Sequence, residues 1–227
     1  MREQFRSDMY ELQDDVVEIM EELLNLTKLS VTALIKGDVV LAQEIIDDDD
    51  RFDELTRGIE ERTIELIATQ FPVARDLRFL MSMSFIAMYQ ERMADYATTI
   101  ARAARRTSNK PVPQPLIDLI NAQANLVYRV MDATRKSLED RDLELALKLP
   151  ELDEPVDSLN KQFYRELGRL TDEDEIEAAS KMVMSARALE RIADYCVDTG
   201  ERLAYFLTGE RDLFEAVEAD IEPQKVI

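Results

Sequence analysis

Four pairs of acidic residues, each spaced four apart, are the side chains of this sequence best suited to chemistry. The pairs are Asp49/Asp53, Glu91/Asp95, Asp153/Asp157 and Glu190/Asp194. Residues four apart lie one above the other on a helix face, so each pair would direct two carboxylates the same way. Converging carboxylates repel one another unless a cation neutralises them. Converged pairs would therefore suit hard cations such as Mg²⁺, Mn²⁺, Ca²⁺ or iron, held by oxygen ligands.

The composition alone makes such pairs common. With 48 Asp and Glu among 227 residues, this spacing should arise by chance about ten times, and most instances would be solvated faces. Two features favour a site over a solvated face. The pairs occupy equivalent positions in the two halves of the chain, and apolar residues such as Ile86 and Leu189 precede them on the same helices. Both interpretations remain open at this point.

The absence of histidine excludes several chemistries. No residue can supply the base of a Ser-His-Asp or Cys-His site, a His ligand to zinc or haem, or the His of a Glu-x-x-His di-iron bundle. The single cysteine, Cys196, permits no internal disulfide and suits a reducing compartment. The net charge of −20 makes the chain a poor nucleic-acid binder, because phosphate contacts need a basic face.

The sequence also bears on location. The amino-terminal stretch carries acidic residues where a signal peptide would be apolar. The longest stretch without charge, residues 79–90, is shorter than the ~20 residues that span a bilayer. We therefore expect a cytoplasmic protein that contacts a membrane through partners.

Helical periodicity extends through the chain and sets the expected elements. We expect helices ending at residue 36, over residues 38–70, 73–106 and 116–138, from residue 142 to an acidic break at 171–175, and over residues 176–207. The Pro-rich stretch of residues 107–115 cannot be helical and separates two halves. Pro155, inside the third acidic pair, predicts a kink there.

An internal repeat relates the halves. Gly37-Asp38-Val-Val-Leu-Ala matches Arg141-Asp142-Leu-Glu-Leu-Ala at an offset of 104 residues. Glu91-Arg-Met-Ala-Asp-Tyr96 matches Glu190-Arg-Ile-Ala-Asp-Tyr195 in five of six positions. These matches predict an all-α fold of two tandem three-helix bundles. The expected parts are residues 1–107, a linker at 108–115, residues 116–209 and a carboxyl-terminal tail at 210–227.

The same motifs resemble those of the PhoU family, regulators of bacterial phosphate-specific transport. The resemblance rests on Gln70-Phe-Pro-Val-Ala-Arg-Asp-Leu-Arg78 followed by Glu91-Arg-Met-Ala-Asp95, and on Glu190-Arg-Ile-Ala-Asp194. It implies multinuclear clusters of iron or zinc on the bundle surface, with Mg or Mn as further possibilities. The metal ligands that it implies are Asp49, Asp53, Glu91, Asp95, Asp153, Asp157, Glu190 and Asp194. The family often has Asn four residues beyond the motif aspartate; here Thr99 and Asp198 stand there, and Asp198 adds an anionic ligand.

The function that this resemblance implies is negative regulation of phosphate uptake and of phosphate-starvation signalling. The implied partners are the ATPase subunit of the phosphate ABC transporter and the sensor histidine kinase, and we also expect a homodimer. The expected regulator is not an enzyme. Two alternatives are a metal-dependent phosphohydrolase that uses the same carboxylates and a helical adaptor without metal.

Overall fold

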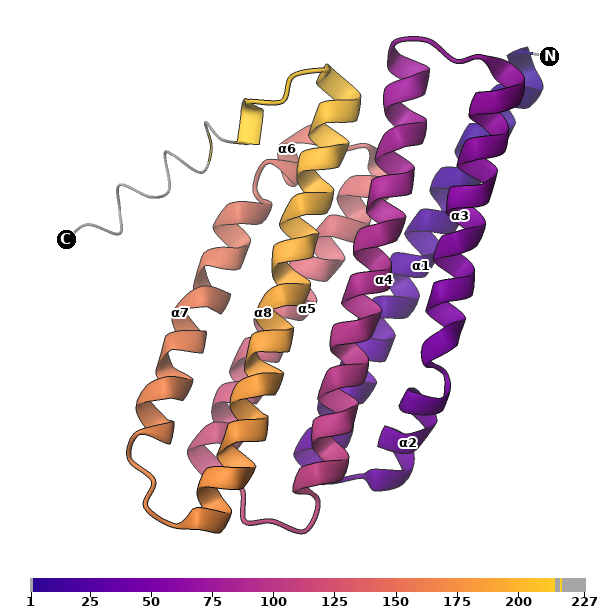
Figure 1. The fold of residues 1–227 in the computed structure, drawn as a ribbon. Coiled ribbons are helices and arrows are strands. Elements are labelled where there is room, and N and C mark those ends of the chain that lie inside the picture. The colour runs from indigo at the N-terminus through magenta and orange to yellow at the C-terminus, as the bar shows by residue number, and fades with distance from the viewer. Residues whose placement is uncertain (1, 215–216, 218–227) are drawn as a thin grey trace.

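The computed structural model describes residues 2–214 and residue 217. Within them the chain is helical, with no strand. The helices are α1 (Arg2–Lys36), α2 (Val39–Asp47), α3 (Asp49–Gln70), α4 (Arg75–Thr107), α5 (Gln114–Asp140), α6 (Leu143–Ala146), α7 (Leu149–Leu167) and α8 (Glu173–Thr208). Six of them are long and run side by side (Figure 1). Most of the predicted tail at 210–227 lies outside the described residues.

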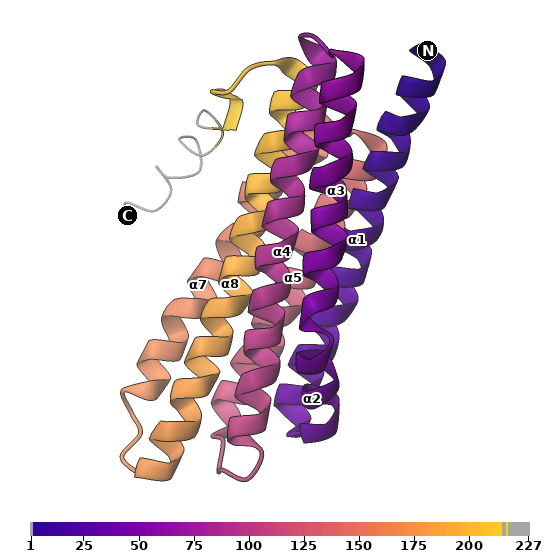
Figure 2. The ribbon, with the colours of Figure 1, turned by 45° about the vertical axis from the view of Figure 1, so that its right-hand side comes forward.

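The predicted arrangement of two tandem three-helix bundles is confirmed. Helices α1, α3 and α4 form the first bundle, and α5, α7 and α8 form the second. The two bundles pack together through α4 against α8 and α1 against α5, while α3 and α7 lie at the two outer sides (Figures 1 and 2). No helix of the described residues is long and apolar enough to span a membrane.

Each bundle's middle helix is broken near its start, which the sequence did not predict. The expected helix over residues 38–70 is interrupted at Asp48, which ends α2 and precedes α3. In the second bundle α6 ends at Ala146 and α7 begins at Leu149. Pro155 lies inside α7 and does not end it.

The repeat is visible in the helix caps. Asp38 and Asp142, related by the offset of 104, each accept a backbone N–H three residues on, from Leu41 and Leu145, at 3.0 Å. The preceding residues, Gly37 and Arg141, both have left-handed backbone, with φ of 62° and 52°. Glycine adopts that conformation without strain, whereas arginine does not.

The helix α8 begins earlier than expected, inside the stretch 171–175 predicted as a break. Asp172 caps it, because its Oδ1 accepts the backbone N–H groups of Asp174 and Glu175 at 3.0 and 3.1 Å. Aspartate is a strong N-cap residue, so the acidic run starts the helix instead of delaying it.

Gly200 sets how closely α8 approaches the junction of α6 and α7. A Cβ at this position would lie 2.6 Å from Leu149 Cδ1 and 3.2 Å from the carbonyl oxygen of Ala146. Leu149 is the first residue of α7, the helix that carries Asp153 and Asp157. The small residue therefore helps to place these carboxylates against α8.

We predict opposite effects for alanine at two helical glycines. Gly200→Ala should lower the free energy of unfolding by about 1–3 kcal/mol, because the methyl group overpacks a filled contact. Gly58→Ala, inside α3 with no neighbour within 4 Å of the added Cβ, should raise it by about 0.5–1 kcal/mol. Urea denaturation followed by far-UV circular dichroism measures both. A stabilised Gly200→Ala variant would contradict the close approach.

Candidate metal centres

The second bundle brings three carboxylates together. Asp153 and Asp157 on α7 and Asp194 on α8 each offer a carboxylate oxygen, and these three oxygens lie within 4.8 Å of one another. All three side chains are partly buried. No other group of three acidic or cysteine side chains in the described residues meets this criterion. The four-residue spacing places the two residues of a pair on one helix face, and the packing of α7 against α8 brings these faces together.

Burial and the mutual repulsion of its carboxylates both act on the cluster of Asp153, Asp157, Glu190 and Asp194 in the second bundle, here called the second cluster. The pKa of Asp153 is raised from its ordinary value of 3.8 to about 7, chiefly by burial and in addition by the negative charges of Asp157 and Asp194. Burial also raises the pKa of Asp194, although the nearby Arg191 opposes this shift. A carboxyl group whose pKa is raised in this way keeps its proton to a higher pH, and this lowers the negative charge of the cluster.

The fourth carboxylate, Glu190, is already neutralised by protein groups. Arg187 forms an ion pair with it, and the side-chain amide of Asn160 donates a hydrogen bond to it. Two buried oxygens of α7 have no hydrogen-bond partner among residues 2–214, Asp153 Oδ1 and Asn160 Oδ1. Buried acceptors are normally satisfied, so these two point to a missing donor or cation.

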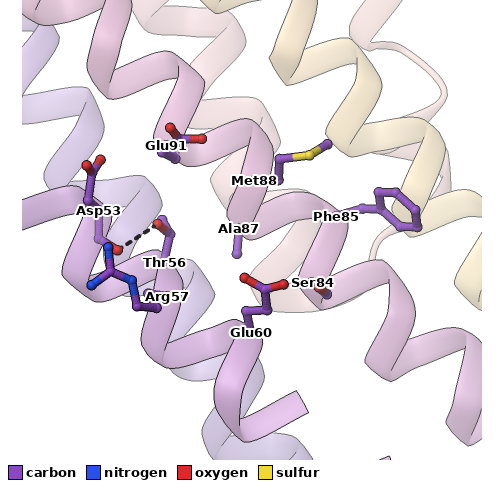
Figure 3. A pocket seen from close by; sticks show the side chains of 9 residues that line it. All are labelled: Asp53, Thr56, Arg57, Glu60, Ser84, Phe85, Ala87, Met88 and Glu91. Carbon is purple, nitrogen blue, oxygen red and sulfur yellow. Dashed lines mark hydrogen bonds between the residues drawn. The ribbon is translucent and has the colours of Figure 1, made fainter. Parts of the chain in front are cut away.

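The first bundle places its four carboxylates along α3 and α4. Asp53 and Glu91 face one groove, which Phe85 and Met88 also line (Figure 3). Burial raises the pKa of Glu91, and the charges of Asp95 and Asp53 add to this shift. Burial raises the pKa of Asp95 as well, together with the charge of Asp49. The predicted pairs therefore act on one another across the two helices.

Arginines occupy part of the first cluster. Arg102 contacts Asp49 at 2.7 Å, and Arg92 lies within 4 Å of both Glu91 and Asp95. The carboxylates here are more open to solvent than those of the second cluster, since Asp53 is exposed. The carboxylate oxygens of the first cluster therefore gather less closely than those of the second.

The residues four beyond each motif aspartate lie beside the clusters but not among the three close oxygens. The hydroxyl of Thr99 donates to the backbone carbonyl of Asp95 at 2.9 Å. Asp198 is partly buried one turn from Asp194; burial raises the pKa of the neighbouring Tyr195, and the charge of Asp198 adds a smaller contribution. The structure thus leaves both residues as neighbours of the sites.

The sequence analysis did not identify the side chains of the protein that pair with the cluster carboxylates. Asn160 is buried on α7. The available signal was its position on the same helix face as the apolar residues Val156 and Phe163. Arg187 and Arg191 each precede a cluster acid by three residues, a spacing that favours ion pairs on a helix. Arg102 contacts Asp49 across two helices, which no local spacing indicates.

The donor set and the orphaned oxygens fit a hard cation or more than one. Three anionic oxygens lie close together here, from Asp153, Asp157 and Asp194. Asn160, on α7 with the first two, adds a neutral amide oxygen. Carboxylate and amide oxygens suit such ions. The second cluster is the better formed of the two candidate centres.

We predict that Asp153→Asn stabilises the metal-free protein at high pH. Between about pH 4 and 7 folded Asp153 keeps a proton that the unfolded chain has lost, so its contribution to stability falls as the pH rises through about 7. The variant should gain on the order of 2 kcal/mol at pH 8, less than full linkage gives because the group is partly solvated, and nothing near pH 4. Urea unfolding in chelator across this pH range measures the difference.

Asp132→Asn on α5 is the matched control, because hydrogen bonding to Lys136 lowers the pKa of Asp132. Its effect should have the opposite sign, a loss of stability that appears above the ordinary pKa of aspartate. If the Asp153→Asn variant were no more stable than the parent at pH 8, this result would contradict the raised pKa of Asp153.

A family model described as the PhoU domain matches residues 16–104 and 120–203. Among similar proteins, one of Aquifex aeolicus is 34% identical over 205 residues, covering 89% of this chain and 92% of its own length. One of Clostridium acetobutylicum is 30% identical over 216 residues, covering 92% and 97%. Both are named phosphate-specific transport system accessory protein PhoU homolog.

Solved structures agree with these matches. PhoU from Pseudomonas aeruginosa superimposes with a TM-score of 0.85 at 25% identity, over 91% of this chain and all of that one. The phosphate transport system regulatory protein PhoU from Streptococcus pneumoniae gives 0.83 at 25% identity, over 91% and 98%. Because the family model covers both bundles and the fold is shared over nearly the whole chain, this protein belongs to the PhoU family.

Proposed function

We propose that this protein is a non-enzymatic regulator that lowers phosphate uptake and represses phosphate-starvation signalling. The observation that carries the proposal is the match of both bundles to the PhoU domain, with relatives named as accessory proteins of phosphate-specific transport. The proposed contacts are the ATPase subunit of a phosphate ABC transporter and a sensor histidine kinase. Both would be met in the cytoplasm, by the protein as a homodimer.

We further propose that both carboxylate clusters bind metal. Asp153, Asp157, Glu190 and Asp194 would hold the ions of the second bundle, and Asp49, Asp53, Glu91 and Asp95 those of the first. Bound ions would supply fixed positive charge where the chain now relies on protons and arginines. The proposed ions are iron or zinc in multinuclear clusters, and the all-oxygen donor set also suits Mg²⁺ or Mn²⁺.

A hydrolytic role for the same clusters has less support. Catalysis of phosphoryl transfer by metal ions also needs positive groups that hold the phosphate. Arg102, Arg187 and Arg191, which lie beside the carboxylates, are engaged in ion pairs with them. This arrangement favours a metal-bearing docking surface over an active site.

Metal content tests the clusters. Changing Glu91, Asp95, Glu190 and Asp194 together to alanine should reduce bound metal, measured by elemental analysis of purified protein, at least tenfold, because each cluster loses both ligands of its second helix. A variant with Asp118 and Asp132 of α5 changed to alanine should keep the parental content. Equal metal in the cluster variant and the parent would refute the metal proposal without affecting family membership.

The regulatory role is tested in cells. A strain without this protein should express a phosphate-starvation reporter in phosphate-replete medium, several-fold above the parent strain, and the intact gene should restore repression. Affinity capture from phosphate-replete cells should recover the transporter ATPase subunit and the kinase. Normal repression in the deletion strain, with neither partner recovered, would overturn the proposed role.

A further inference from the structure

A second cavity lies at one end of the molecule, apart from both carboxylate clusters. The turn between α3 and α4, the start of α1 and the end of α8 meet at this end (Figures 1 and 2). The cavity has a volume of about 700 Å³, within the usual range for small-molecule sites. Arg6, Arg75 and Arg141 line it, with Asp76 as its one acidic residue. A locally positive cavity is unexpected in a chain with a net charge of −20.

Two of these guanidinium groups gather around one ring. Arg75 lies 5.9 Å and Arg141 5.6 Å from the ring centroid of Phe206. Within the described residues neither arginine, nor Arg6, forms an ion pair with a carboxylate. Like charges brought close together are unfavourable, so this group of guanidinium groups favours the binding of an anion.

The guanidinium of Arg141 is held in a fixed plane. Its Nε donates to Gln13 Oε1 at 2.7 Å, and the buried Gln13 in turn donates to the carbonyl oxygen of Leu138 at 2.7 Å. The rings of Tyr10 and Phe79 also lie against it, with centroids at 4.9 and 5.5 Å. Among the described residues only Nε of Arg141 has a hydrogen-bond partner, so the donors of both Nη groups can serve a ligand. An ordered, planar fork of this kind suits phosphate or carboxylate.

Aromatic side chains complete the cavity wall. Phe71 is 80% exposed and Tyr10 is 56% exposed, and both line the cavity. The amino terminus of α4 opens here without a side-chain cap. Backbone strain collects at the same end, since Phe71, Ala74 and Arg141 are the positive-φ residues other than glycine in the described chain. The site therefore combines anion donors with exposed rings on which a planar group could stack.

We propose that this end cavity binds a nucleoside phosphate, with its phosphates on Arg75 and Arg141 and its base against Phe71. A cavity of about 700 Å³ accommodates a molecule of this size. The arginines match the phosphate charge and the exposed ring matches the base. The residues that line this site include none of the carboxylates of either cluster, so the proposal does not rest on metal binding.

Isothermal titration calorimetry with ATP tests the proposal, with EDTA present so that metal at the clusters does not attract the phosphates. ATP should bind saturably at one site. Arg75→Gln should raise its Kd at least tenfold, as the loss of a charge-assisted contact does. Arg105→Gln, which removes an exposed arginine in the last turn of α4, is the matched control and should change Kd less than twofold. Arg141→Gln should act like Arg75→Gln.

Two further arms separate the base from the phosphates. Inorganic phosphate should bind at least tenfold more weakly than ATP, and Phe71→Ala should weaken ATP by about tenfold while leaving phosphate unchanged. Because Arg75 and Phe71 are exposed, their variants should unfold at the parental urea concentration. Absence of saturable ATP binding, equal losses in the Arg105→Gln control, or equal affinity for phosphate and ATP would each overturn the proposal.

Discussion

The repulsion between carboxylates on adjacent helices is the main physical constraint on the two candidate sites of this structure. Packing α7 against α8 brings oxygens of Asp153, Asp157 and Asp194 within 4.8 Å of one another, in partly buried surroundings. Such an arrangement persists only if its charge is neutralised. In this structure a proton on Asp153, whose pKa is raised, and the guanidinium of Arg187 beside Glu190 reduce the negative charge. A bound cation would take over both of these roles.

The groups that neutralise the carboxylates differ between the two bundles, and this difference predicts that the two sites bind cations differently. In the first bundle Arg102 neutralises Asp49 directly, and Asp53 is open to solvent. In the second, Asp153 Oδ1 has no hydrogen-bond partner in the described part of the chain. A cation at the second cluster would displace a proton from Asp153, so its affinity there would rise with pH up to about 7. A cation at the first would compete chiefly with an arginine.

The parts of the structure that the sequence made predictable depend on local spacing. The offset of 104 places Asp38 and Asp142 as equivalent caps, and the four-residue spacing places each acidic pair on one face. The break at Asp48 was not predictable, because the periodicity of α2 continues into α3. The contact of Asn160 with Glu190 depends on how α7 sits against α8. No local pattern carries that information.

Arg141 shows how a repeat can acquire a new role at one copy. The equivalent residue of the first bundle, Gly37, adopts the left-handed backbone without cost, whereas a residue with a Cβ pays about 1 kcal/mol. The side chain that causes this strain is bound by Gln13 and lies against three rings contributed by α1, α4 and α8. Those contacts join the two bundles at the end of the molecule. The same guanidinium therefore links the bundles and lines the cavity, so a ligand bound there would stabilise the packed arrangement of the two bundles.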